Sequence, residues 1–144
     1  VLWDHALDPK IRGFIKLKAK KDIKRVILCS GKIYFDLLEA REKFKRNDLV
    51  FYRIEQLYPF PAKSLVKELK PYAKKAKFYW CQEEPKNMGA WFSVRDYIQW
   101  TLDSIKANNN QVSYIGRSPD ASPATGYVKR HNSQQQEIIK KVFE

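Results

Sequence analysis

The stretch FYWCQEEPKNMGAW, from Phe78 to Trp91, decides the fold of this chain. It begins with four consecutive apolar residues and ends at Trp91, where a helical pattern of apolar residues starts. Continuous apolarity predicts a strand that is buried on both faces, as in a parallel sheet covered by helices. The polar residues between, with Pro85 and Gly89, predict a loop. The stretch therefore predicts one strand–loop–helix unit of a parallel sheet.

The same unit recurs on both sides of this stretch. Three more short apolar runs, VILC, LVFYRI and VSYI, occupy residues 26–29, 49–54 and 112–115. Apolar residues at helical spacing follow each run, over residues 33–44, 65–72 and 138–143. Alternation of this kind predicts an α/β fold with a doubly wound, mostly parallel sheet of about five strands and helices on both faces. We expect residues 25–144 to form this domain, and residues 1–24 to be an N-terminal extension or linker in which GFIKLKA supplies one edge strand.

Composition limits the class of protein. The chain has 144 residues, 44% of them hydrophobic, which suits a single domain with one core. It has no apolar run of about 18 residues, so we expect no membrane span. Because it lacks an initiator Met and a signal-peptide pattern, we expect the C-terminal piece of a longer protein. Cys29 and Cys81 fall in predicted strands and indicate small core residues in a reducing compartment, and two histidines without close cysteines make a metal site unexpected.

The formal net charge of +12 raises the alternative of a basic module that binds nucleic acid. Lysines concentrate in residues 16–25 and 70–77. Neither group alternates with aromatic residues, as a base-stacking surface would. The second group follows a predicted helix, where cations complement the helix dipole. Nucleic-acid binding is therefore the weaker interpretation.

The carboxyl ends of parallel strands meet at one sheet edge, where α/β proteins place ligand and partner sites. A helix N-terminus after Ser30-Gly31-Lys32 could attract phosphate, and Arg53 offers a planar fork suited to phosphate. The predicted effector phosphate site comprises Ser30, Lys32, Arg53 and Gln56. The competing structural interpretation makes Ser30 a helix cap and pairs Arg53 with Glu55 or Glu83.

The remaining residues of this edge are predicted to be structural or to form an interface. They are Glu55, Tyr58, Phe60, Gln82, Glu83, Glu84, Trp91 and Arg117. The adjacent carboxylates Glu83 and Glu84 invite an acid–base role, but neighbouring side chains point apart, which favours loop anchoring. Aromatic residues are enriched where proteins meet, so we expect Tyr58, Phe60 and Trp91 to form an exposed patch. A core position is the alternative for Trp91. No catalytic triad, metal cluster or phosphate loop is recognisable, and no catalytic, cofactor-binding or metal-ligating residue is assigned.

Five segments, taken in order, carry a family resemblance. They are RVILCSGKIYFDLLEAR, RIEQLYPFP, WCQEEPKNMGAW, GRSPDASPATGY and HNSQQQEII, at residues 25–41, 53–61, 80–91, 116–127 and 131–139. Together they resemble the C-terminal, transketolase-like domain of the thiamine-diphosphate-dependent decarboxylating component of 2-oxoglutarate dehydrogenase. The resemblance covers residues 25–144. RIEQLYPFP occurs across transketolase-like enzymes, whereas the third and fourth segments are more specific.

The resemblance implies a role in the tricarboxylic acid cycle: oxidative decarboxylation of 2-oxoglutarate, with succinyl transfer to lipoyl groups of a succinyltransferase core. It implies that thiamine diphosphate and magnesium are bound by preceding domains, so this chain alone should be inactive. It also implies a homodimer within a multienzyme complex, and a regulatory site for an effector such as AMP or acetyl-CoA. The expected location is the cytoplasm of a bacterium, or the mitochondrial matrix of a eukaryote.

Overall fold

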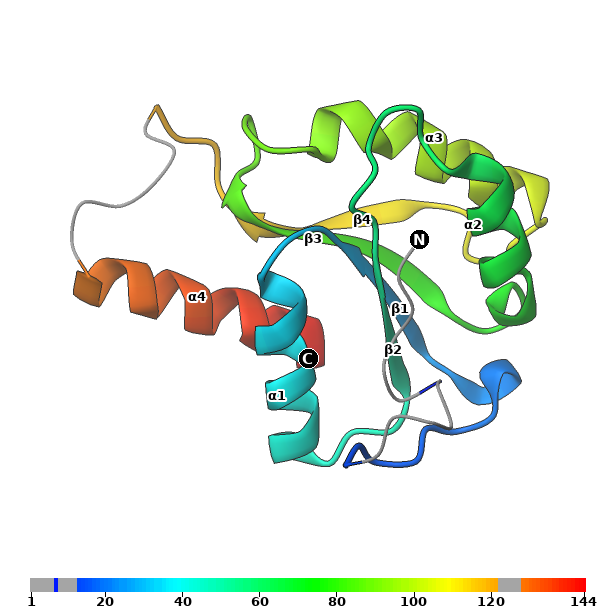
Figure 1. Cartoon of the computed structure of the whole chain (residues 1–144), viewed down its shortest axis with the longest axis horizontal. Coiled ribbons are helices and arrows are strands. Elements are labelled where there is room, and N and C mark those ends of the chain that lie inside the picture. The colour runs from blue at the N-terminus through cyan, green and yellow to red at the C-terminus, as the bar shows by residue number, and fades with distance from the viewer. Residues whose placement is uncertain (1–6, 8–12, 122–127) are drawn as a thin grey trace.

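Four parallel strands form the sheet of the computed structural model, which describes residues 7, 13–121 and 128–144. The strands are β1 (Arg25–Cys29), β2 (Leu49–Arg53), β3 (Lys77–Pro85) and β4 (Val112–Arg117), in the spatial order β2-β1-β3-β4 (Figure 1). The predicted α/β class with a parallel sheet is confirmed. The predicted count of about five strands is wrong by one within the described residues.

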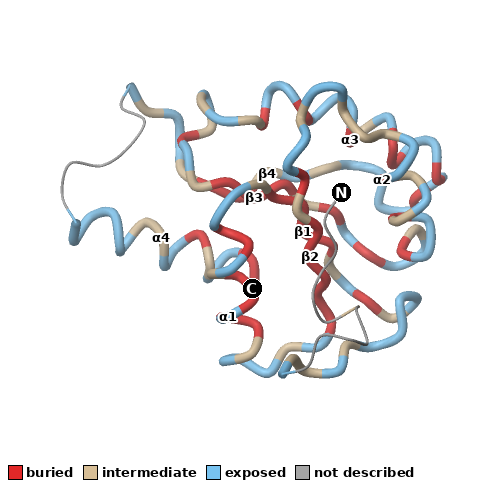
Figure 2. The backbone as a smooth tube through the Cα atoms, viewed as in Figure 1, coloured by how far each residue is buried: buried red, intermediate tan, exposed pale blue. Residues whose placement is uncertain are grey.

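Helices cover both faces of the sheet, as predicted. They are α1 (Ile33–Phe44), α2 (Ala62–Leu69), α3 (Trp91–Ser104) and α4 (Val128–Phe143), with short 3₁₀ turns η2 (Lys20–Asp22) and η3 (Lys70–Tyr72). Alternate strand residues point to opposite faces. Val26 and Leu28 join the core under α2 and α3, whereas Ile27 and Cys29 join the core under α1 and α4. Buried residues therefore follow the strands through the middle of the molecule (Figure 2).

The strand order creates a switch point at the carboxyl edge of the sheet. From β1 the chain runs outward through α1 to β2, and then returns past β1 to β3 and β4. The chain therefore leaves β1 toward the face covered by α1 and leaves β3 toward the opposite face, covered by α3. In open α/β sheets such a point is the usual place for a binding crevice. It brings Ser30 and Gly31 close to the Gln82–Glu84 segment.

The third strand is longer than the sequence predicted. FYWC was expected to end at Cys81, yet β3 continues through the polar residues to Pro85, with an irregular register between Cys81 and Pro85. Gln82 can occupy this buried position because its amide hydrogen-bonds to neighbouring backbone groups. The Glu83-Glu84 pair thus lies in a strand, where successive side chains face opposite sides of the sheet.

The expected edge strand at residues 13–19 is absent from the described part of the chain. Instead, the Ile15 N–H donates to both carboxylate oxygens of Glu42, at 2.9 and 3.0 Å. The Lys18 N–H donates to the Asn47 carbonyl at 2.9 Å. Contacts with α1 and the following loop satisfy these backbone donors, so the segment pairs with no strand.

Two arginines, Arg25 of β1 and Arg46 of the loop between α1 and β2, hold the C-terminus of α4. Arg25 donates to the carbonyls of Lys141 and Val142, at 3.2 and 2.9 Å. Arg46 donates to the Phe143 carbonyl at 2.7 Å. Cations that bind the last carbonyls also complement the negative end of the helix dipole. These bonds hold α4 against the face that it shares with α1.

Both cysteines are core residues. Cys29 and Cys81 are register partners on β1 and β3, fully buried and not bonded to each other. This confirms the prediction that they act as small apolar residues. Among the described residues, no helix has the length and apolarity needed to cross a bilayer.

Candidate functional site

A cavity of about 540 Å³ opens at the carboxyl edge of the sheet, on the side of α2 and α3. We call it the carboxyl-edge cavity. It is lined by Ser30, Gly31, Leu57, Tyr58, Trp80, Gln82, Glu84, Gly89, Ala90, Ser93 and Tyr97. Its volume lies within the range of small-molecule sites. Three of the edge segments that sequence analysis expected to gather, after β1, β2 and β3, meet here, whereas Arg117 at the end of β4 does not line this cavity.

Gln82 organises the floor of this cavity. Its side-chain carbonyl accepts from Trp80 Nε1 at 3.0 Å and from the Trp91 N–H at 3.1 Å. Its amide nitrogen donates to the carbonyls of Glu84, Pro85 and Met88, at 3.2, 3.0 and 2.8 Å. With an exposed fraction of 2%, Gln82 ties the end of β3, the loop and the start of α3 together.

Two glycines allow this close packing. Gly89 has φ of +67°, and an added Cβ would lie 3.1 Å from Glu84 Oε2. At Gly116, an added Cβ would lie 2.9 Å from the Gln82 carbonyl oxygen and would also strike the Tyr114 phenol. The Tyr114 hydroxyl donates to the Arg117 carbonyl at 2.7 Å, and burial raises its pKa to about 12. The neutral phenol therefore remains a hydrogen-bond donor at physiological pH.

A polar network closes the switch point on the other face of the sheet. Lys32 Nζ donates to Glu83 Oε1 at 2.8 Å, and Gln135 Nε2 donates to the same oxygen at 2.9 Å. Gln135 also reaches Asp36 Oδ2 at 3.1 Å, so the network joins α1, β3 and α4. The hydrogen bond to Glu83 raises the pKa of Lys32. Glu83 thus anchors neighbouring elements, as the structural interpretation proposed.

Glu83 and Glu84 cannot act as a pair. The Glu83 carboxylate joins the network with α1 and α4, whereas the Glu84 carboxylate lies beside Gly89 on the α3 side. Two carboxylates on opposite faces of a sheet share neither a proton nor a substrate. His131 is exposed on α4. The arrangement suits binding rather than acid–base chemistry.

Three of the four predicted effector residues have other partners in the structure. Ser30 lines the carboxyl-edge cavity, but Lys32 binds Glu83. Arg53 lies over the adjacent rings of Tyr34 and Phe35, with its Cζ 5.1 Å from each centroid. Gln56 donates to the Pro59 carbonyl at 3.3 Å.

Glu55, rather than Ser30, provides the side-chain acceptor at the turn before α1. Its Oε1 lies 3.2 Å from Arg53 Nε, close enough for an ion pair although without hydrogen-bond geometry. The same oxygen accepts from the Gly31 N–H at 3.0 Å. The N-cap residue of α1 is Lys32, and its side chain makes no cap hydrogen bond, so the prediction of a Ser30 cap is wrong. Any phosphate at this turn must compete with Glu55.

The expected aromatic patch forms only in part. Tyr58 is 89% exposed. Phe60 is half-buried and stacks on Tyr97, with centroids 5.1 Å apart. Trp91 was expected to be exposed and is instead 7% exposed, packed 5.5 Å from the Tyr114 ring. Tyr97 of α3 is 48% exposed and lines the cavity.

Comparison with known proteins identifies the family. The model of the family described as "2-oxoglutarate dehydrogenase C-terminal" matches residues 3–143. The chain belongs to this family. The match includes residues 3–24, which precede the α/β unit, as well as all four strands.

Relatives of this 2-oxoglutarate dehydrogenase C-terminal family are similar over most of the chain. The 2-oxoglutarate dehydrogenase E1 components of Brucella abortus and Brucella anthropi are each 51% identical over 134 residues, which is 93% of this chain. The chain spans 13% of the length of each relative. A solved structure, a split-gene transketolase described as an inactive β4 tetramer, has a TM-score of 0.57 at 13% identity. It covers 92% of this chain and 40% of its own, and it supports the transketolase-like fold alone.

Proposed function

We propose that this chain is a non-catalytic assembly domain of a 2-oxoglutarate dehydrogenase E1 component. The family match over residues 3–143 carries this proposal. The chain corresponds to 13% of the Brucella E1 relatives, so most of such an enzyme lies in other segments. The complete enzyme would decarboxylate 2-oxoglutarate oxidatively in the tricarboxylic acid cycle and pass the succinyl group to lipoyl groups.

The residues that the structure describes do not fit thiamine diphosphate and magnesium. Within residues 7, 13–121 and 128–144, no three His, Cys, Asp or Glu side chains are grouped so that they could hold a metal ion. At the switch point, the Gly31 N–H already binds Glu55 and Lys32 already binds Glu83. We therefore assign cofactor binding to other domains of the enzyme and route no chemical step through this chain.

Assembly is supported by the chemistry of the carboxyl edge. The cavity rim presents Tyr58 and Tyr97, two large aromatic side chains that are mostly or half exposed. Aromatic residues of this kind are enriched in protein interfaces. The partners that we propose are the remaining E1 domains, a second E1 subunit and the lipoyl-bearing succinyltransferase core. The location would be the cytoplasm of a bacterial source or the mitochondrial matrix of a eukaryotic one.

An effector such as AMP or acetyl-CoA remains part of the proposal. Its phosphate would bind beside Ser30 and the Gly31 N–H, which line the cavity. The Gly31 N–H becomes available only if Glu55 moves away from it. Calorimetric titration with each effector tests this. Binding that Glu55→Gln strengthens supports the site, whereas affinity unchanged in both Glu55→Gln and Arg53→Ala removes it.

The experiment that tests the proposed function is a decarboxylation assay. The chain is supplied with 2-oxoglutarate, thiamine diphosphate and magnesium, and reduction of ferricyanide is followed. We expect no turnover above the protein-free control. Measurable turnover by this chain alone would show that it carries catalytic groups and would refute its assignment as an assembly domain.

A further inference from the structure

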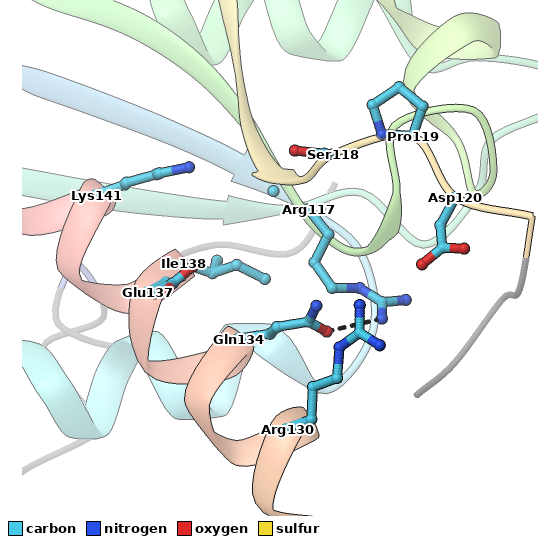
Figure 3. A pocket seen from close by; sticks show the side chains of 10 residues that line it. Arg117, Ser118, Pro119, Asp120, Arg130, Gln134, Glu137, Ile138 and Lys141 are labelled. Atoms are coloured by element: carbon cyan, nitrogen blue, oxygen red, sulfur yellow. Dashed lines mark hydrogen bonds between the residues drawn. The ribbon is translucent and has the colours of Figure 1, made fainter. Parts of the chain in front are cut away.

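A second hollow lies on the opposite face of the sheet, between the end of β4 and helix α4 (Figure 3). We call it the α4 groove. Its volume is about 290 Å³, and its main polar residues are Arg117, Ser118, Asp120, Arg130, Gln134 and Lys141. It shares no lining residue with the carboxyl-edge cavity. The GRSPDASPATGY motif begins here, and the proposed assembly function gives this groove no role.

Arg117 is held rigidly at the groove wall. Its Nε donates to the Glu83 carbonyl at 2.8 Å, and its Nη1 donates to Gln134 Oε1 at 3.1 Å. Figure 3 shows that second bond as a dashed line and shows the guanidinium pointing into the groove. Both of these acceptors are neutral, and together they fix the orientation of the guanidinium. Arg117 is therefore preorganised to bind an anion.

Arg130 approaches Arg117 from the first turn of α4. It is exposed, and the two guanidinium groups point toward one another in Figure 3. Among the described residues, no carboxylate is within ion-pair distance of Arg130. Two like charges directed at one space repel unless an anion lies between them. A cation in the first turn of a helix is also disfavoured by the helix dipole, so helix stability does not explain Arg130.

We propose that the α4 groove binds a small phosphate-bearing anion between Arg117 and Arg130. Guanidinium forks match phosphate oxygens, and two forks from different elements satisfy a tetrahedral dianion better than a planar carboxylate. The Ser118 hydroxyl lines the same groove. A volume of about 290 Å³ lies just below the usual range of drug-sized sites, which favours inorganic phosphate or a short phosphate monoester over a nucleotide.

The other charges of the groove limit where the anion binds. Asp120 and Glu137 also line it, and Figure 3 shows the Asp120 carboxylate on the same side as the two guanidinium groups. The two arginines exceed Asp120 there by one positive charge. Lys141 follows Arg130 by eleven residues, about 16 Å along a helix, and lies beyond reach of a phosphate held by the arginine pair. Lys141 thus provides a control within the groove. Lys129 provides a second control, since it is exposed beside Arg130 but does not line the groove.

The test is an NMR titration of the ¹⁵N-labelled chain at pH 7.5, with chloride holding the ionic strength constant. One arm uses inorganic phosphate and a second uses glycerol 3-phosphate, which separates a free anion from a phosphate ester. At least one should bind saturably, with a dissociation constant of about 1 mM or tighter, and shift the amides of residues 116–121 and 128–138. Arg130→Gln should weaken this binding about tenfold, because it removes charge-assisted hydrogen bonds. Lys129→Gln and Lys141→Gln should change it less than about twofold, because each is remote from the anion.

Three results would overturn the proposal. The first is non-saturating binding of both probes, which would indicate only diffuse attraction to a basic surface. The second is equal weakening by Arg130→Gln and the two lysine controls, which would mean that net charge rather than the arginine pair binds the anion. The third is tighter binding of succinate than of either phosphate probe, which would assign the groove to carboxylates. Normal dispersion of the variant spectra verifies that each variant is folded.

Discussion

Replacement of Gln82 by leucine should destabilise the chain strongly, although the two side chains are similar in size. Leucine removes the acceptor of two buried donors, Trp80 Nε1 and the Trp91 N–H. Trp80 is 1% exposed and Trp91 is 7% exposed, so water cannot readily replace the lost oxygen. Each buried donor left without a partner costs about 1–3 kcal/mol. The two together give a loss of about 4 kcal/mol.

The assay is urea denaturation followed by circular dichroism. The free energies of unfolding of the wild type and the variant are compared with the same dependence on urea concentration (m value) for both. For a chain of this length, about 4 kcal/mol corresponds to a fall of about 13 °C in the melting temperature. Gln136→Leu makes the same chemical change on an exposed position of α4 and should cost less than about 0.5 kcal/mol. A loss below about 1 kcal/mol for Gln82→Leu would show that water enters the cavity floor and satisfies both donors. The assignment of Gln82 as the organiser of that floor would then be wrong.

Three further predictions follow from the same packing. Gly116→Ala should cost about 1–3 kcal/mol, because the new Cβ lies 2.6 Å from Tyr114 Cζ; an unchanged urea midpoint would contradict this. Burial raises the pKa of Asp48, but the hydrogen bond and charge of Arg46 outweigh it and hold that pKa below its ordinary value. Since a depressed pKa stabilises the fold above the unfolded value of about 3.9, stability should fall more steeply between pH 5 and 3 in the wild type than in Asp48→Asn, and parallel pH profiles would refute the pairing. Burial raises the pKa of Cys81 to about 12, so Ellman's reagent should label it at pH 8 only after unfolding, and rapid labelling of the native chain would disprove its burial.

The fold could be predicted from the sequence because each strand is a short apolar run that does not also have the spacing of a helix. VILC, LVFYRI, FYWC and VSYI all became strands of one parallel sheet. The end of β3 was missed because Gln82 and the residues after it are polar, and polar letters after an apolar run indicate a loop. Whether a buried glutamine finds five hydrogen-bonding groups depends on the path of the loop that follows. The local composition of the sequence does not determine the path of that loop.

The site was predictable as a place but not as a set of contacts. Parallel topology alone brought Ser30, Gln82 and Glu84 to one cavity. The occupancy of the Gly31 turn by Glu55 was not predictable, because a carboxylate from the β2 segment stands where a ligand phosphate was expected. Likewise Trp91 was expected at the surface, since its burial depends on Tyr114 from a distant strand.

Arg130 shows a similar limit. It lies on the polar side of the last helix, where sequence indicates only a solvated cation. Its significance appears when the fold directs it toward Arg117, which the sequence had marked as an interface residue. The approach of the two arginines depends on how β4 and α4 are placed relative to one another. The spacing of residues along the chain does not predict that placement.

The central claim is that this chain assembles a 2-oxoglutarate dehydrogenase E1 component without performing its chemistry. The most direct test compares a complete E1 polypeptide that contains this chain with the same polypeptide lacking residues 25–144, by sedimentation and by ferricyanide-linked oxidation of 2-oxoglutarate. We predict that the deletion abolishes the dimer and the activity together, while thiamine diphosphate binding, followed by calorimetry, persists in the remaining domains. A deletion variant that remains dimeric and fully active would contradict the account.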